Sequence, residues 1–328
     1  MDWLKILIDA GRAAVGVPAA AYALSSIGLN LQFGYTGLLN FGHVAFMLVG
    51  AYGMAITADA GAPLWLGIPV GIAAAAVLGL LLGIPTLRLR ADYLAIVTIA
   101  AGEILRLLAR SSFAEPLTNG VFGIQAFAGA FYDINPIPDG QYGIGRFRFD
   151  ERTLWVMLVA WTLVVLAALL IRRLTRSPWG RVIRAIREDE DAARSLGKNV
   201  FSYKLQSLVI GGAVGATAGM VLAINQQNVA PDDWLPLLTF YSFTIVIIGG
   251  PGRLWGPVVG SVIFWFLFVL LDGFMNGAVA QGWFGDLLTS TDVGPIRFAL
   301  LGVALMLLMI FRPQGIFGSR EEMLIDVR

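Results

Sequence analysis

The chain consists mainly of long apolar stretches separated by short polar connections. Nine stretches, rich in Leu, Ala, Val and Gly, have the length of helices. None alternates apolar and polar residues over about ten positions, as an outer-membrane β-strand would. Because a spanning helix needs about 20 mostly apolar residues, the pattern predicts an all-α, polytopic membrane protein with about eight to ten transmembrane helices in a single domain over residues 1–328. The stretches are Ala13–Leu31, Gly34–Ala58, Leu64–Leu87, Ala91–Ala109, Thr153–Ile171, Gln206–Asn225, Leu237–Gly249, Trp255–Leu271 and Ile296–Phe311.

The composition agrees with this class and narrows the chemistry. Of 328 residues, 57% are hydrophobic and 14% are charged, which excludes an ordinary soluble enzyme. The 23 Lys and Arg nearly balance the 22 Asp and Glu, so nothing points to a nucleic-acid partner. The chain has no cysteine and one histidine, His43, so neither thiolate chemistry nor a histidine cluster for a metal ion is expected.

The distribution of charge predicts the orientation in the membrane. Residues 172–204 hold nine basic and four acidic residues, whereas residues 110–152 hold four basic and five acidic ones. Since cytoplasmic connections carry the excess of Lys and Arg, we expect a cytoplasmic loop over 172–204 and a periplasmic loop over 110–152. Nine alternating crossings then put the N-terminus outside. With the N-terminus inside, one crossing is missing, and the stretch Leu29–Ala58 is the place to look for it.

The first residues, Met1–Ala14, lack the basic start and the small-residue cleavage site of a signal peptide. We interpret them as an interfacial helix that leads into the first span.

The cytoplasmic loop contains an amphipathic segment. Pro178 stands where the start of a helix tolerates proline, and Gly197 stands where a helix is expected to end. Between them, helical spacing is kept by Val182, Ile186, Asp189, Ala193 and Leu196. A short helix of this kind, joined rigidly to the flanking spans, can transmit force from a partner below the membrane. The alternative is a basic loop that lies on anionic headgroups.

A second segment, Gly34–Phe46, interrupts an otherwise apolar stretch. Three glycines together with Asn40 and His43 predict a broken helix. Transporters use such breaks at substrate sites, because the freed backbone groups then face a cavity and not lipid. The alternative is that Asn40 and His43, three residues apart, only form hydrogen bonds to a neighbouring helix.

An acidic and a basic side chain lie within one predicted span. Glu103 and Arg106 are three residues apart and therefore on one face of a helix. A local salt bridge near the outer end is the simpler interpretation. A role in gating or substrate passage is the alternative.

The remaining motifs argue against chemistry in this chain. Gly249–Pro257 predicts a tight Gly/Pro turn on the cytoplasmic side. The only Gly-Lys pair, Gly197-Lys198, lacks the spacing of a phosphate-binding loop, so neither an ATP site nor another cofactor is expected. No metalloprotease or serine-hydrolase motif is present, so we assign no catalytic residue and do not expect an enzyme. Glycines four residues apart, as in Gly211, Gly215 and Gly219, indicate close helix packing or, alternatively, a subunit seam.

Several ordered motifs together resemble a known family. They are Gly34–Gly37 with Gly42–Phe46, Leu87–Thr98, Gly102–Arg106, Thr118–Ile124, Arg176–Glu188 and Gly249–Pro257. From Leu24 to Phe317 the chain resembles the permease subunits of bacterial branched-chain amino acid ABC importers, of the LivM type. The resemblance implies the ABC importer permease fold and a multi-pass protein of the bacterial inner membrane.

The resemblance also implies partners and residue roles. Cytoplasmic ATPase subunits would use the ATP and dock on a loop that many ABC importer permeases mark with E-A-A-x-x-x-G, matched here by Asp191–Gly197 with Asp for Glu. A second homologous permease and a periplasmic substrate-binding protein would complete the importer. The implied coupling residues are Arg184, Arg187, Glu188, Asp191, Ala192, Ala193 and Gly197, and the candidates for the substrate passage are Asn40, Gly42, His43, Thr98 and Glu103.

The predicted function is thus the passage of branched-chain or related amino acids across the inner membrane, driven by a separate ATPase. A urea or short-amide permease of the same family is the first alternative. An ion-coupled secondary carrier is less favoured, because such a carrier needs acids in the core of several spans. Here the only candidates, Glu103 and Asp272, both sit near span ends.

Overall fold

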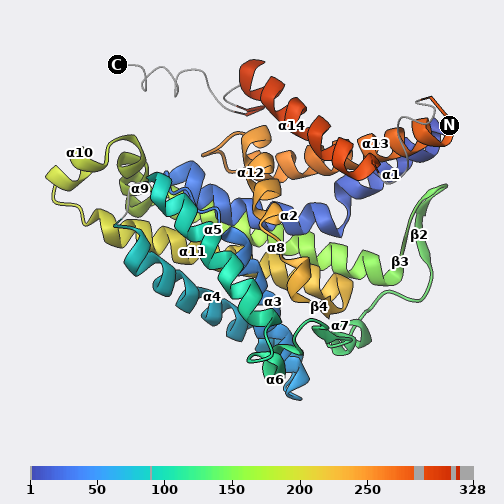
Figure 1. Ribbon diagram of the computed structural model, residues 1–328, viewed down its shortest axis with the longest axis horizontal. Helices are drawn as coiled ribbons and strands as arrows, with labels where there is room; N and C mark the ends of the chain where they lie inside the picture. The colour runs from blue at the N-terminus through green and yellow to red at the C-terminus, as the bar shows by residue number, and fades with distance from the viewer. Residues whose placement is uncertain (1, 89–90, 284–291, 312–314, 318–328) are drawn as a thin grey trace.

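Helices make up nearly all of the secondary structure (Figure 1). The computed structural model describes residues 2–88, 91–283, 292–311 and 315–317. Each of the nine predicted stretches overlaps a helix, which confirms the all-α polytopic class. These helices are α2 (Val17–Leu29), α3 (His43–Asp59), α4 (Leu64–Thr86), α5 (Ala91–Arg110), α8 (Glu151–Arg176), α11 (Val200–Gln226), α12 (Leu237–Gly249), α13 (Gly256–Ala280) and α14 (Val293–Phe311).

Some residues of the predicted features lie outside the described residues. They are residue 1 of the segment Met1–Ala14, residues 89–90 of the motif Leu87–Thr98, and residues 284–291, 312–314 and 318–328 of the single domain predicted over 1–328.

The helices differ in their capacity to span a membrane. By length and composition, four of the described helices qualify singly: α4, α8, α11 and α13. A fifth candidate is the pair formed by α1 (Trp3–Val15) and Val17–Tyr35, which is bent by 42°. The bend lies at Gly16, whose extended backbone ends α1. The helix α3 is apolar but has only 17 residues, and α12 has 13. The predicted number of spans therefore includes helices that are too short to cross a membrane alone.

The two charged loops lie at opposite ends of the bundle. The helix α8 begins directly after the hairpin of β2 (Gln141–Ile144) and β3 (Phe147–Asp150), and it leads directly into α9 (Pro178–Glu188). With 26 residues, it separates these two elements by about 39 Å. We call the end that holds α9 the inner end and the end that holds β2 and β3 the outer end. The separation agrees with opposite membrane sides for the two loops.

The N-terminus lies at the outer end, beside the hairpin (Figure 1). An ion pair joins Asp2 to Arg146 at 3.3 Å, and the guanidinium of Arg12 stands over the ring of Phe149. The helix α1 packs along α13, with the rings of Trp3 and Phe274 5.7 Å apart. The helix α1 therefore begins at the same end as the loop predicted to be periplasmic, and the side of the membrane stays a prediction.

Glycine governs the packing of the central helix, α11. In its most apolar 18-residue window 72% of the residues are buried, against 28% for α8. A Cβ on Gly215 would lie 2.6 Å from Nε2 of His43, and one on Gly219 would collide with the carbonyl of Met47. These glycines therefore let α11 approach α3 within one chain, as the packing interpretation predicted.

The outer end is closed by short elements that come from both halves of the sequence. The strand β1 (Ile124–Gln125) pairs antiparallel with β4 (Asn228–Val229), with Ile124 opposite Val229. Around this pair lie α6 (Glu115–Thr118), α7 (Gly129–Asp133) and the 3-10 turn η2 (Pro231–Asp233). The predicted periplasmic loop is thereby joined to the connection between α11 and α12.

Candidate functional site

The helix break predicted at Gly34–Phe46 is present. The helix α2 continues into a π-helical segment, η1 (Asn30–Tyr35), after which Thr36–Gly42 form no helix. Gly37 has a φ of 76°, a left-handed conformation that favours glycine. The helix α3 then starts at His43, with Gly42 as its N-cap.

Buried polar side chains satisfy the backbone and one another at the break. The amide of Asn40 donates to Oε1 of Gln32 at 3.0 Å, and Oδ1 of Asn40 accepts from the amide of Gly42 at 3.1 Å. Nε2 of Gln32 in turn donates to the carbonyl of Leu208 on α11 at 3.0 Å. Both side chains are buried. The break is therefore held to the central helix by a connected hydrogen-bond network.

The helix α5 supplies the opposite wall of the break. Oγ1 of Thr98 accepts from the amide of Phe41 at 3.1 Å and donates to the carbonyl of Ala95 at 2.9 Å. A Cβ on Gly42 would collide with the carbonyl of Thr98. Asn40, Gly42 and Thr98, which the sequence placed among the passage candidates, thus lie together.

The contacts of His43 match the alternative interpretation, in which this side chain forms hydrogen bonds to a neighbouring helix. Its side chain is fully buried, and Nε2 lies 3.1 Å from the carbonyl oxygen of Ser25 on α2. Its ring packs against the backbone of Gly215. His43 therefore joins three helices in this conformation, and its place in the passage stays a prediction.

The ion pair expected between Glu103 and Arg106 is confirmed and is part of a larger cluster. Nη2 of Arg106 lies 2.5 Å from Oε1 of Glu103, and Nε donates to Oε2 at 3.0 Å. Nη1 of Arg106 reaches Asp232 of η2 at 2.8 Å. Glu103 is thus engaged at the outer end of α5, and a role in the passage stays a prediction.

An aromatic cluster beside the break was missed in the sequence. The ring of Phe41 stacks on Phe243 of α12 with centroids 4.5 Å apart, and Phe240 lies 5.6 Å away. Oγ1 of Thr239 accepts from the amide of Val44 at 2.9 Å. The available signal was the pair Phe240 and Phe243, three residues apart in the stretch Leu237–Gly249.

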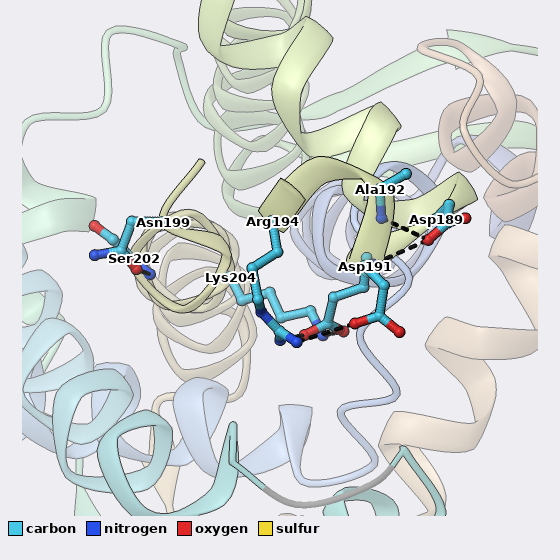
Figure 2. Close-up of polar contacts among 8 residues, drawn as sticks. Asp189, Asp191, Ala192, Arg194, Asn199, Ser202 and Lys204 are labelled. Atoms are coloured by element: carbon cyan, nitrogen blue, oxygen red, sulfur yellow. Dashed lines mark hydrogen bonds and ion pairs between the residues drawn. The ribbon is translucent and has the colours of Figure 1, made fainter. Parts of the chain in front are cut away.

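The expectation of one helix between Pro178 and Gly197 is wrong. Two helices are present, α9 and α10 (Glu190–Ser195), and the extended residue Asp189 separates them. Oδ1 of Asp189 accepts from the amides of Asp191 and Ala192, both at 2.9 Å (Figure 2). Asp189 does not continue an apolar face, because it is the N-cap of α10.

Two ion pairs lie within α10, and a third joins α10 to the start of α11. Arg194 lies 3.0 Å from both Glu190 and Asp191, and Lys204 of α11 pairs with Glu190 (Figure 2). Gly197 follows the helix with a φ of 74°, which favours glycine at this position. We call residues 178–197, which comprise α9, Asp189, α10 and the two residues after it, the lever.

The predicted coupling residues of the lever differ in burial. Ala193 is buried, as are Ile183 and Ile186. The residues exposed at the inner end include Glu188, Asp191, Ala192 and Gly197, and Leu196 of the apolar spacing is 79% exposed.

The two arginines of the predicted set reach back to the bundle. Nη2 of Arg184 donates to the carbonyl of Thr175 at 3.0 Å, and its guanidinium stands 5.7 Å from the ring centroid of Tyr35. Nη1 of Arg187 donates to the carbonyl of Gly34 in η1.

Comparison with known proteins gives one consistent result. The family model for the permease component of branched-chain amino acid transport systems matches residues 13–311. The high-affinity branched-chain amino acid transport system permease protein LivM of Escherichia coli (strain K12) is 32% identical over 97% of this chain and 72% of its own length. The probable LivM of Methanocaldococcus jannaschii is 27% identical over 91% of both chains. The permease protein BraD of Pseudomonas aeruginosa is 24% identical over 92% of this chain and 93% of its own. The chain therefore belongs to the family of permease components of branched-chain amino acid transport systems.

Proposed function

We propose that this chain is the membrane-spanning permease subunit of an ATP-binding cassette importer in the bacterial inner membrane. It carries branched-chain or related amino acids inward and is not itself an enzyme. The energy comes from ATP that separate cytoplasmic ATPase subunits hydrolyse. The observation that carries the proposal is the lever, whose arginines hold the π-helical end of the broken span.

The exposed C-terminal part of the lever, residues 188–197, is the proposed docking surface for an ATPase subunit. It combines the apolar side chain of Leu196 with the exposed Ala192 and the carboxylates of Glu188 and Asp191. This surface contains Asp191–Gly197, the segment that matches the docking motif of many ABC importer permeases. The buried Ile183, Ile186 and Ala193 provide the rigid back of this surface.

The substrate passage is proposed to run beside the break. Asn40, Gly42 and Thr98 supply the polar groups there, and the rings of Phe41 and Phe240 supply an apolar surface. Phe240 is 45% exposed, so it is available to a second permease or to an apolar side chain in transit. His43 and Glu103 remain candidates for the passage.

Transport then follows alternating access. A periplasmic binding protein delivers the substrate to the outer end, and a second homologous permease completes the passage. Nucleotide binding draws the levers together and moves the two permeases relative to each other. The nucleotide can drive this change only through its different affinity for the two states.

Purification from native membranes tests the proposal. The wild-type chain should retain an ATPase with a phosphate-binding loop and a second permease. The variant Leu196→Glu should lose the ATPase. The matched control Ile144→Glu, which makes the same kind of change at a 90% exposed position of β2, should keep it.

Uptake by reconstituted vesicles completes the test. The assembled complex should accumulate leucine, isoleucine or valine with ATP, and urea in their place would identify the short-amide alternative. Accumulation against a gradient by vesicles that contain this chain alone would contradict the proposal and identify a stand-alone carrier.

A further inference from the structure

Three segments that are distant in the sequence meet at the inner end of the helix break. They are η1, the turn between α12 and α13, and the lever helix α9. Oδ1 of Asn30 accepts from the amide of Gly252 at 2.8 Å, and Nδ2 of Asn30 donates to the carbonyl of Arg253 at 2.9 Å. Asn30 is buried, so its side chain fixes the turn against the first residue of η1.

Arg187 brings α9 to the same point. Its guanidinium donates to the carbonyl of Gly34, and a Cβ on Gly252 would lie 3.0 Å from its Nη1. Nearer the backbone, a Cβ on Gly37 would lie 3.4 Å from Cγ of Arg187. The side chain of Arg187 therefore lies across the last turn of η1 and the first residues of the break.

The carbonyl of Gly34 needs such a donor. In a continued helix it would accept from an amide four or five residues further on. Here the helix ends at Tyr35, and the amide of Leu38 donates instead to Gln32 at 2.8 Å. A helix C-terminus leaves carbonyls without intrahelical donors, and a cationic side chain satisfies them well. Arg187 thus caps the C-terminal end of η1 from another helix.

We propose that Arg187 is a positioning residue that transmits movement of the lever to the helix break, by capping η1 at Gly34. The inference rests on the proposed function, because it assumes that an ATPase moves the lever. A displacement of α9 must carry Gly34 with it or leave that carbonyl without its donor. Through Asn30, the same displacement reaches the turn between α12 and α13.

Loss of the Arg187 cap and loss of a docking contact should have different effects on the complex. A docking residue is needed for the ATPase to bind. A transmitting residue is needed only for the bound ATPase to change the permease. The test must therefore measure ATPase retention and movement at the break separately.

The absence of cysteine provides a specific probe of the break. In a Leu39→Cys chain the only thiol lies in the non-helical segment, at a partly exposed position. The assay uses the complete complex in lipid nanodiscs, a maleimide reagent, and either no nucleotide or a non-hydrolysable ATP analogue. With Arg187 in place, the labelling rate of the introduced thiol should change with the analogue.

The variants Arg187→Ala and Arg187→Lys are compared with Arg181→Ala, each in the Leu39→Cys chain. Arg181 is exposed on the same helix, and its side chain makes no hydrogen bond or ion pair to the residues that the structure describes. Arg187→Ala should retain the ATPase, lose the nucleotide-dependent change in thiol labelling and lower ATP-driven leucine uptake about tenfold. Arg187→Lys keeps the charge without the forked guanidinium and should fall between Arg187→Ala and wild type. Arg181→Ala should resemble wild type in all three measurements.

Each other result has a definite meaning. Loss of the ATPase from Arg187→Ala, with Arg187→Lys intact, would identify a docking residue and overturn the inference. A labelling response in both Arg187 variants that equals that of Arg181→Ala would also overturn it. If the wild-type chain itself retains no ATPase, the proposed function fails first, and the two failures are thereby distinguished.

Discussion

Nη1 of Arg106 lies 2.8 Å from Oδ1 of Asp232, and this ion pair joins the outer end of α5 to the turn η2. The two residues are 126 positions apart in the sequence. The side chain of Arg106 is only 9% exposed and also holds Glu103. The pair therefore fastens the helix that faces the break to the connection between α11 and α12.

Removal of this fastening should destabilise the protein. Arg106→Ala leaves the carboxylates of Glu103 and Asp232 without their shared cation. Because both carboxylates are partly exposed, we expect a loss of about 1–3 kcal/mol in the free energy of unfolding. The measurement is denaturant unfolding in mixed micelles. Arg110, 44% exposed and 3.2 Å from the same Asp232, provides the matched control, and Arg110→Ala should cost less than about 1 kcal/mol. Equal losses of unfolding free energy in Arg106→Ala and Arg110→Ala would show that the burial of Arg106 does not strengthen its ion pairs.

Gly42 should tolerate no side chain. In Gly42→Leu the new Cβ meets the backbone carbonyl of Thr98, which cannot turn aside as a flexible side chain could. We expect the break to be displaced and uptake to fall about tenfold or more. Gly102 of α5 faces the same contact, but its Cβ would lie at an ordinary 3.7 Å from Ala45 and Gly42. Gly102→Ala should therefore transport normally. Normal uptake by Gly42→Leu would show that the substrate passage does not run beside the contact between Gly42 and Thr98.

Thr98 should be replaceable by serine and not by valine. Thr98→Val removes the oxygen that accepts from the amide of Phe41, and that amide then lacks its partner. The expected cost is about 1–3 kcal/mol in unfolding free energy. Thr98→Ser keeps the hydroxyl and should lose little. A valine variant as stable as the serine variant would show that the amide finds another acceptor.

Alanine at Gly219 should disturb the central packing. A Cβ there collides with the carbonyl of Met47 on α3, so the helices α11 and α3 must separate. We expect a loss of about 1–3 kcal/mol, measured by unfolding in micelles. On α14, a Cβ at Gly302 has no atom within 4 Å among the described residues, and Gly302→Ala should be neutral or slightly stabilising. Equal unfolding free energies for Gly219→Ala and Gly302→Ala would contradict the close packing of α11 against α3.

Acid should weaken the start of α8. Partial burial tends to raise the pKa of Asp150, but hydrogen bonds from the hydroxyl and amide of Thr153 outweigh it and hold the pKa below its ordinary value. The unfolded chain therefore binds the proton more tightly than the native one. The contribution of Asp150 to stability is present above its ordinary pKa and is lost as pH falls through the lowered native value.

The variant Asp150→Asn keeps an acceptor for Thr153 and does not titrate. Thermal unfolding in detergent between pH 6 and about 3 should show a smaller decrease in Tm for Asp150→Asn than for wild type. Parallel curves would show that this carboxyl does not contribute to the acid sensitivity.

Local patterns in the sequence determined the class of the protein and much of its outline. Each of the nine apolar stretches overlaps a helix, and three glycines near Asn40 marked the break correctly. The excess of Arg in residues 172–204 correctly placed this loop at the opposite end of the bundle from residues 110–152. The pair Glu103 and Arg106 could be predicted because residues three apart on one helix are neighbours in any fold. These features depend only on helical geometry and on the difference between lipid and water.

The tertiary structure alone decided which residues meet across helices. Nothing in the sequence connects Arg106 with Asp232, Asn30 with Gly252, or Arg187 with Gly34. The division of the lever at Asp189 was also missed. Asp189 fits the helical spacing from Val182 to Leu196, and that spacing does not distinguish a residue inside one helix from the N-cap of a second helix. A helix that is apolar on every side does not indicate which side meets which neighbour, since lipid and protein are equally apolar partners. Those pairings follow from close contacts at glycine and from buried hydrogen bonds, which become visible only when the whole bundle is assembled.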